Sequence, residues 1–420
     1  MTLVLFGVFF LCLVIGVPVA FSIGLAAVAV LFAGDVDRLV VVQRMFAASD
    51  SFSLIAIPFF IFAGDLLASG AISKRLVAFA ESLVGGIRGG LSIVSVVAGM
   101  FFAAISGSGA ATTAAVGATL IPELEERGYK PESSAALIAS AGTIGVVIPP
   151  SVPMVLYAVV AEQSVTKLFQ NGFLPGVLMG IALIAISLWQ AYKFDYPKGT
   201  PFSFRNVWET LKRSIWGLLM PLIILGGIFS GYFTPSEAAV IAVVYALIIS
   251  AFVYKDLTWK SLHKIMVGSV KTSAIIMIII ACSGVFGWVL ANWKIPETIA
   301  TGVLSVSSNK FVILFLVSVI ILVAGVFMET SSAVIILTPV FLPLMKALEV
   351  NLIHFGILFT VGIAIGMITP PVAINLFVAS SITGMPIERI SKAVIPFLVG
   401  LIAIFFLIVY VPIFLPGVIM

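Results

Sequence analysis

Two stretches of the chain combine hydroxyl-bearing or small residues with paired prolines inside apolar sequence. The first contains Ser106-Gly107-Ser108-Gly109-Ala110-Ala111-Thr112-Thr113, followed by Pro122, Gly145, Pro149-Pro150 and Pro175. The second contains Glu329-Thr330-Ser331-Ser332, followed by Pro343, Gly366, Pro370-Pro371 and Pro396. Four prolines and one glycine match at one offset, since 343 − 122, 366 − 145, 370 − 149, 371 − 150 and 396 − 175 all equal 221. Such matching breaks inside apolar segments indicate the binding site of a secondary transporter.

The paired prolines predict an unwound segment within each of two membrane helices. Each pair removes two amide donors and excludes the α conformation for the residue before it. The carbonyls of residues 145–148 and 366–369 therefore lose their helical partners. Unwound carbonyls suit Na⁺, and the helix N-termini that follow the breaks suit a carboxylate.

We predict two Na⁺ sites that flank one anion site near the middle of the membrane. The first Na⁺ site is predicted at Ser106, Gly107, Gly109, Gly145 and Ile148, and the second at Glu329, Thr330, Ser331, Gly366 and Thr369. The anion is expected at Ser108, Thr112, Thr113, Ser151 and Asn375. No Lys or Arg lies in the core of a predicted span, so helix dipoles, hydroxyls, bound Na⁺ or another subunit must hold the anion.

Structural roles compete with each of these assignments. The small-residue run also suits close helix packing, and Asn375 equally suits a hydrogen bond between helices. Glu329 equally suits a hydrogen bond to nearby backbone. Glu237 follows a Thr-Pro-Ser turn and is explained by capping of the next helix.

The composition places the chain in a membrane. It is 61% hydrophobic and 10% charged, whereas soluble proteins average about 25% charged residues. We expect the first apolar segment to be retained and not cleaved as a signal peptide. Cys12 and Cys282 lie in apolar runs and are predicted to be buried. The net charge of +4 reflects membrane topology and does not indicate nucleic acid.

The apolar segments predict an all-α fold of two halves with about five spans each. The first half is 1–193, with a re-entrant hairpin at 91–125 and a broken helix at 133–161. A cytoplasmic linker at 194–213 joins it to the second half, 214–420. The second half has its hairpin at 311–346 and its broken helix at 352–383. Interfacial helices are expected at 71–88 and 294–309. Whether 3–33 crosses the membrane once or twice stays open.

The basic residues predict that the two halves are inverted. With the linker in the cytoplasm, the opposite side keeps six of the 22 Lys and Arg residues, so the other 16 lie on the cytoplasmic side. The positive-inside rule demands this bias. Both termini are then expected on the periplasmic side.

The chain resembles the large membrane subunit of tripartite ATP-independent periplasmic (TRAP) transporters. The resemblance rests on the hairpin run from Ser106, on Gly142–Ser151, and on Ile368-Thr369-Pro370-Pro371-Val372-Ala373-Ile374-Asn375. It implies Na⁺-driven uptake of an organic anion, such as sialic acid or a C4-dicarboxylate, across the bacterial inner membrane by an elevator motion. It also implies two protein partners, which are a periplasmic substrate-binding protein and a small four-helix membrane subunit on a separate chain. The organic anion, the coupling ion Na⁺ and membrane lipid are the other implied partners.

Two other readings of the sequence differ in their consequences. A one-component divalent-anion/Na⁺ symporter has similar hairpins and needs no binding protein. An intramembrane enzyme needs clustered His, Asp or Cys at one membrane face, whereas His263 and His354 are predicted on opposite sides. We therefore expect a transporter and not an enzyme.

Overall fold

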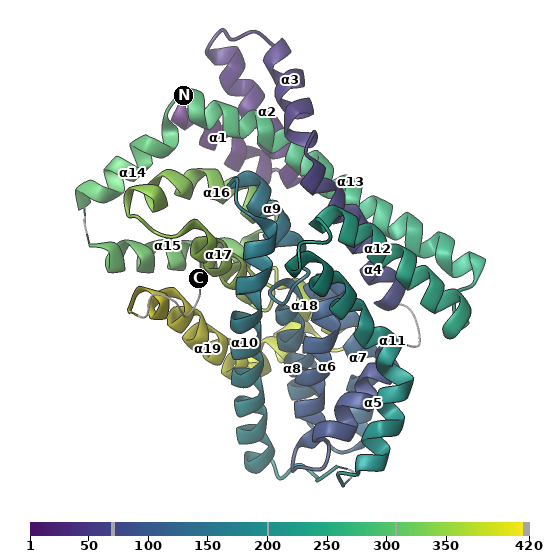
Figure 1. Ribbon diagram of the computed structural model, residues 1–420. Helices are drawn as coiled ribbons and strands as arrows, with labels where there is room; N and C mark the ends of the chain where they lie inside the picture. Colours follow the sequence, from purple (N-terminus) through teal and green to yellow (C-terminus); the bar gives the residue numbers. More distant parts are fainter. Residues whose placement is uncertain (69–71, 200, 307–308, 415–420) are drawn as a thin grey trace.

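A computed structural model describes residues 1–68, 72–199, 201–306 and 309–414 of the chain, and these residues fold into helices (Figure 1). The all-α, multi-helix architecture predicted from composition is confirmed. Within the described ranges, seven helices are long and apolar enough to cross a membrane, or up to eight if one bent pair is counted as a span. The predicted count of about five spans per half is higher, because Thr2–Val14, Val19–Ala33 and the two parts of each predicted broken helix are too short to count as spans. In the other direction, both helices of the predicted second hairpin, Lys310–Phe327 and Thr330–Ala347, are long and apolar enough to count.

The first half contains α1 to α10. Their bounds are α1 Thr2–Val14, α2 Val19–Ala33, α3 Leu39–Ser49, α4 Ala56–Ala68, α5 Ile72–Val84, α6 Gly90–Ser106, α7 Gly109–Glu126, α8 Pro131–Thr143, α9 Val152–Val160 and α10 Val165–Lys193. Two 3-10 turns precede α4 and follow α8, at Phe52–Ile55 and Ile144–Val146. The helices α1 and α2 pack against each other, with Gly16 at φ +85° in the turn between them, so residues 3–33 form two helices and not one straight span.

The second half contains α11 to α19. Their bounds are α11 Phe204–Phe229, α12 Pro235–Ile248, α13 Trp259–Asn292, α14 Ile295–Val306, α15 Lys310–Phe327, α16 Thr330–Ala347, α17 Leu352–Gly366, α18 Ile374–Thr383 and α19 Ile387–Phe414. A π-helical turn, Ile249–Val253, extends α12. The ends of the predicted interfacial segments at residue 71 and residues 307–308, and the predicted second half beyond residue 414, lie outside the described residues.

Helix boundaries recur at the offset found in the sequence. The helices α7 and α16 begin at residues 109 and 330, and α8 and α17 begin at 131 and 352, a difference of 221 in both cases. The peptide bonds Pro149-Pro150 and Pro370-Pro371 are both cis. The predicted hairpins are occupied by α6–α7 and α15–α16, and the predicted broken helices by α8–α9 and α17–α18.

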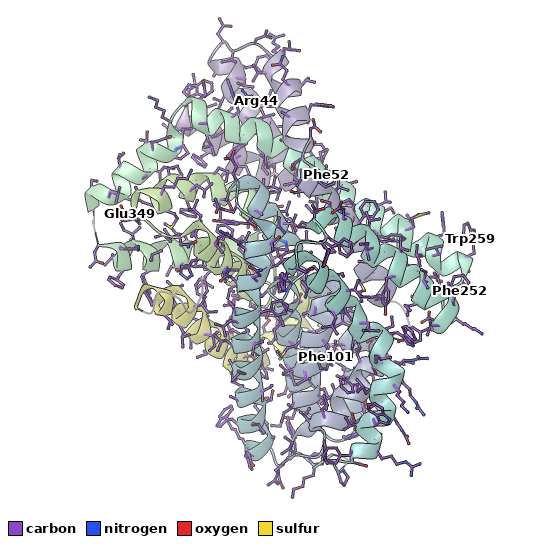
Figure 2. All side chains as sticks on the ribbon, viewed as in Figure 1. Arg44, Phe52, Phe101, Phe252, Trp259 and Glu349 are labelled. Carbon is purple, nitrogen blue, oxygen red and sulfur yellow. The ribbon has the colours of Figure 1, made fainter. Side chains whose placement is uncertain are left out.

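Two helices begin earlier than the apolar sequence suggests. The predicted linker 194–213 is shortened because α11 starts at Phe204, and α13 starts at Trp259, in a polar stretch that contains Lys260, His263 and Lys264. Their first turns are polar but locally stabilised: Arg205 pairs with Glu209, and Thr258 and Ser261 form a capping box. Figure 2 shows Trp259 at the outer edge of the molecule, where its side chain is 85% exposed. Hydrophobicity alone misses such turns.

Elements of the two halves interleave around the broken helices. The helix α18 packs on α7 and α8, and α9 packs on α16. The Tyr157 hydroxyl of α9 donates to the Leu352 carbonyl at the start of α17 over 2.7 Å. Cys12 and Cys282 are buried free thiols, as predicted. The hairpin tips and breaks of both halves are thereby brought together.

Candidate functional site

A cavity of about 200 Å³ lies where the two hairpin tips meet the two helix breaks. Its walls come from both halves: the tips supply Gly107, Ser108, Gly109 and Ala110 together with Glu329, Thr330 and Ser331, and the breaks supply Val146, Val152, Pro153, Met367 and Ile374. Five pairs of these residues match at the sequence offset, since 329 − 108, 330 − 109, 331 − 110, 367 − 146 and 374 − 153 all equal 221. Ile61 of α4 and Thr272 and Ile276 of α13 close the cavity.

The first hairpin tip is seated directly on the first break. Gly107 has φ +61°, a left-handed conformation that favours glycine, and ends α6. A Cβ atom on Gly107 would lie 2.5 Å from the Pro150 carbonyl oxygen. Ser108 then caps α7, its side chain accepting from the Ala111 amide over 3.4 Å. Only glycine lets the tip approach the break this closely.

Three oxygens form a triangle at this tip. The Ser106 and Thr112 hydroxyl oxygens lie 2.8 Å apart, the Thr112 hydroxyl donates to the Ser108 carbonyl over 2.8 Å, and the Ser106 hydroxyl donates to the same carbonyl over 3.2 Å. A Cβ atom on Gly145 would lie 2.5 Å from Thr112 Oγ1 and 2.7 Å from the Ser108 carbonyl. Hydroxyl and carbonyl oxygens are the donors that suit Na⁺, so the residues present fit that ion.

Three predicted ligands of the first half, Ser151, Ile148 and Thr113, make other contacts. The Ser151 hydroxyl is fully buried, donates to the Val146 carbonyl over 2.5 Å and caps α9. The Ile148 side chain packs against Gly176 of α10. Thr113 donates to the Gly109 carbonyl over 2.9 Å and faces Gly142 of α8. Neither Ser151 nor Thr113 lines the central cavity.

The second hairpin tip carries a carboxylate. Glu329 caps α16: its side chain accepts from the amides of Ser331 over 2.9 Å and Ser332 over 3.2 Å, and from the Ser331 hydroxyl over 3.1 Å. An acidic cap complements the positive end of the helix dipole. Glu329, Thr330 and Ser331 all line the cavity.

Gly366 and Thr369, the remaining predicted residues of the second Na⁺ site, belong to the second break and do not line the central cavity. Gly366 lies against Gly325 of α15, an approach that a side chain on either residue would prevent. The Thr369 hydroxyl donates to the Ile365 carbonyl over 2.9 Å. Some carbonyls expected to lack helical partners find other donors, because Gly366 accepts from the Thr369 amide and Met367 from the Asn375 amide, both over 3.0 Å. A carbonyl has a second lone pair, so these bonds leave room for an ion.

Asn375 connects the second break to the first half of the chain. It is fully buried, and its side-chain amide donates to the Ala139 carbonyl of α8 over 3.0 Å. Its Oδ1 atom is buried and has no partner among the described residues. The residue lies behind the cavity wall, whereas its neighbour Ile374 lines the cavity. Of the five predicted anion ligands, Ser108 alone lines the cavity.

Several cavity residues carried no sequence signal of their own. Ile61, Thr272 and Ile276 come from helices outside the hairpins and breaks, and no motif marks them. Val146 and Met367 adjoin the breaks at matching positions, which the offset of 221 could have revealed.

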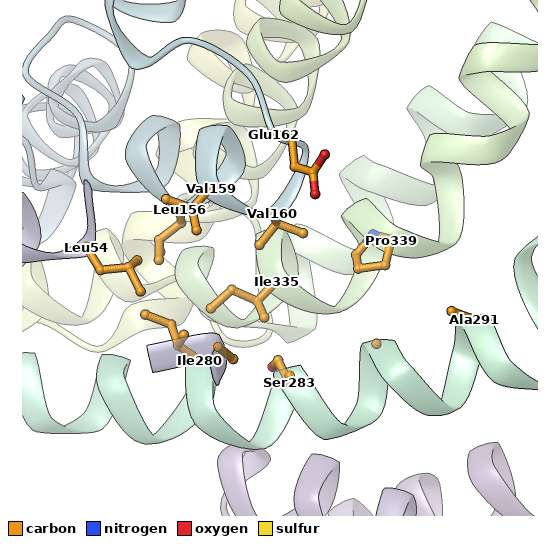
Figure 3. A pocket seen from close by; sticks show the side chains of 13 residues that line it. Leu54, Leu156, Val159, Val160, Glu162, Ile280, Ser283, Ala291, Ile335 and Pro339 are labelled. Atoms are coloured by element: carbon orange, nitrogen blue, oxygen red, sulfur yellow. The ribbon is translucent and has the colours of Figure 1, made fainter. Parts of the chain in front are cut away.

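Two larger cavities flank the central one. One, of about 450 Å³, runs along α7 at Ala111, Ala114 and Ala118 and reaches Asp65 of α4 and Lys74 of α5. The other, of about 470 Å³, runs along α16 at Ile335 and Pro339; Figure 3 shows these side chains facing the same space as Leu156 and Ser283. Ala114 and Ile335, and Ala118 and Pro339, again differ by 221. Each hairpin thus presents its second helix to a cavity.

The charges in the central cavity constrain what it can bind. Among its described lining residues Glu329 is charged, and there is neither Lys nor Arg. Hydroxyls and helix N-termini are the remaining polar groups. Such groups are chemically suited to small ions and to the acidic groups of a solute.

A multi-helix protein whose paired hairpins and breaks surround one cavity has the architecture of a membrane transporter. Comparison with known families makes this specific: residues 6–414 match the family described as "Tripartite ATP-independent periplasmic transporter, DctM component". The chain belongs to this family of TRAP transporter permeases, which are not enzymes, and it is a multi-pass protein of the inner membrane.

Relatives with assigned names span several organic acids. The chain is 43% identical over 415 residues to the "Isethionate TRAP transporter permease protein DctMQ" of Oleidesulfovibrio alaskensis, covering 97% of this chain and 65% of that protein. It is 41% identical to the C4-dicarboxylate TRAP transporter large permease protein DctM of Pseudomonas aeruginosa, with 93% and 92% covered. It is 35% identical to the sialic acid TRAP transporter large permease protein SiaM of Vibrio cholerae, with 94% and 93% covered.

A solved structure shares the fold. The YdaH transporter of Alcanivorax borkumensis superposes with a TM-score of 0.67 over 90% of this chain and 88% of that one, at 15% identity. At this identity the likeness concerns the fold alone.

Proposed function

We propose that the chain is the large permease subunit of a Na⁺-coupled importer of an organic anion. The observation that carries the proposal is the central cavity, whose walls are built from five residue pairs at one offset. Secondary transporters place substrate and coupling ions at such a repeat interface. The substrate class is that of the relatives, which are named for isethionate, C4-dicarboxylates and sialic acid.

The coupling ions bind on either side of the anion. One Na⁺ binds the oxygen triangle of Ser106, Ser108 and Thr112 beside Gly145. The other binds near Glu329, with Thr330 and Ser331 close by. The anion lies between the tips, against Ser108 and the N-termini of α7 and α16. Because none of the described residues that line the cavity is basic, bound Na⁺ supplies the positive charge that the anion meets.

The two halves are inverted repeats that move as an elevator. The hairpins and broken helices carry the solute, while α1 to α4 and α11 to α13 form the fixed scaffold. The flanking cavity along α7 opens to the cytoplasm and the one along α16 to the periplasm. Both termini lie on the periplasmic side, as the distribution of Lys and Arg favours.

The partners are a small membrane subunit and a periplasmic binding protein. The family description names a tripartite transporter, which supports both. The small subunit packs on the scaffold, and the binding protein delivers the anion from the periplasm.

The decisive experiment is uptake into vesicles that contain this chain and its small subunit. We expect uptake of a labelled organic acid only with an inward Na⁺ gradient and the matching binding protein. Uptake of free acid without the binding protein would instead favour a one-component symporter. Equal uptake with K⁺ in place of Na⁺ would refute the coupling.

A further inference from the structure

The central cavity is the narrowest of the three spaces along the two hairpins. It measures about 200 Å³, whereas its neighbours measure about 450 and 470 Å³. Pockets for drug-sized ligands span roughly 300–1,000 Å³. Both flanking cavities fall in that range and the central one falls below it, so the space between the hairpin tips is the smallest of the three.

One side chain accounts for much of this narrowing. Met367 and Val146 occupy equivalent positions in the two breaks, and both line the cavity. The longer Met367 side chain reaches the opposite tip, since a Cβ atom on Gly109 would lie 2.8 Å from its terminal methyl carbon. Both residues are buried, at 7% and 3% exposure.

We propose that this permease carries small organic acids of about two to four carbons and excludes nine-carbon sugar acids, with Met367 setting the upper limit. The inference rests on the proposed function, because it names the substrate class of the same site. The polar groups around the space agree with it: the Ser108 and Thr330 hydroxyls can satisfy one acidic group, whereas the Val146, Ile276 and Ile374 walls offer nothing to the many hydroxyls of a sugar.

The test is direct binding to the purified chain with its small subunit, in Na⁺, which avoids selection by the binding protein. The probes are lactate, succinate and N-acetylneuraminate, titrated by calorimetry. We expect lactate or succinate to bind about tenfold or more tightly than N-acetylneuraminate. Met367→Ala should reduce this preference to below about threefold. The control is Met179→Ala, which removes an equally buried methionine of α10 that does not line the cavity.

A second variant keeps the test decisive if Met367→Ala does not fold. Val146→Met adds the longer side chain to the other wall and should weaken succinate more than lactate. Equal binding of N-acetylneuraminate and succinate by the unmodified complex would overturn the size limit while leaving the transport function intact. Binding of none of the acids, together with no binding-protein-dependent uptake, would overturn the proposed function itself.

Discussion

The contact between the first hairpin tip and the first break can be tested by a single methyl group. Gly107→Ala places a Cβ atom 2.5 Å from the Pro150 carbonyl oxygen, well inside van der Waals contact. Alanine at φ +61° also costs about 1–2 kcal/mol for its left-handed conformation. Gly384→Ala is the matched control, because its φ is +69° and no atom lies within 4 Å of its Cβ position. Both variants are destabilised by the left-handed conformation, and Gly107→Ala alone is also destabilised by the collision.

The collision should appear as lost Na⁺ affinity. Relieving it moves the tip from the break and separates the Ser106–Ser108–Thr112 oxygens from Gly145. Overpacking of this kind costs about 1–3 kcal/mol, and each 1.4 kcal/mol is a factor of ten. We therefore expect the Na⁺ concentration for half-maximal uptake to rise by roughly 5- to 150-fold in Gly107→Ala relative to Gly384→Ala. The assay is uptake into vesicles over a Na⁺ titration with the binding protein saturating. The same half-maximal concentration in both variants would refute a cation site at this tip.

Substitutions at three further residues probe the remaining contacts. Thr112→Val keeps the shape of the side chain but removes a hydroxyl of the oxygen triangle, so Na⁺ should bind about 10- to 100-fold more weakly. The control Thr119→Val, on the same helix, should leave Na⁺ affinity unchanged. Equal Na⁺ affinity in the two variants would exclude Thr112 as a ligand. Glu329→Gln keeps an acceptor for the Ser331 amide and should weaken Na⁺ binding without unfolding the protein. Glu329→Ala removes the helix cap as well and should also lower the stability by about 1 kcal/mol. If the thermal unfolding and the Na⁺ affinity of both variants match those of the unmodified chain, the carboxylate has neither role. Asn375→Leu removes the side-chain donor to the Ala139 carbonyl and should lower the free energy of unfolding by about 0.5–1.5 kcal/mol, measured by thermal unfolding. An unchanged melting temperature would show that this cross-half bond contributes nothing.

The parts of the fold that depend on local chemistry were accessible from the sequence. Pro149-Pro150 and Pro370-Pro371 cannot continue a helix, and α8 and α17 end before them. Gly107 and Ser108 supply the turn and the cap between α6 and α7. The start of α11 was missed because its first turns, with Phe204 and Trp208 exposed, are amphipathic and fail a test based on hydrophobicity.

The directions of side chains were not accessible in the same way. Ser151 and Asn375 lie at the breaks, as their sequence positions require, but Ser151 turns back to Val146 and Asn375 turns to Ala139 of the other half. Each bond depends on a backbone carbonyl whose position is fixed only by tertiary packing. The contributions of Ile61, Thr272 and Ile276 depend likewise on how α4 and α13 pack against the hairpins. The offset between the two halves locates the tips and breaks, but it does not indicate which residues α4 and α13 contribute to the cavity.

The two hairpin tips are equivalent in position but not in charge, and in the proposed mechanism this difference predicts an order of binding. Ser108 and Glu329 both cap the second helix of their hairpin, yet one is neutral and the other is a carboxylate. An anion that enters the cavity meets the Glu329 charge unless a cation lies beside it, because no Lys or Arg lines the described walls. Na⁺ at the second tip should therefore bind before the anion, whereas the first tip attracts its ion with dipoles alone. It follows that Glu329→Gln weakens Na⁺ binding and at the same time makes anion binding less dependent on Na⁺. A purely structural cap would produce neither change, so the two measurements together separate the roles of this residue.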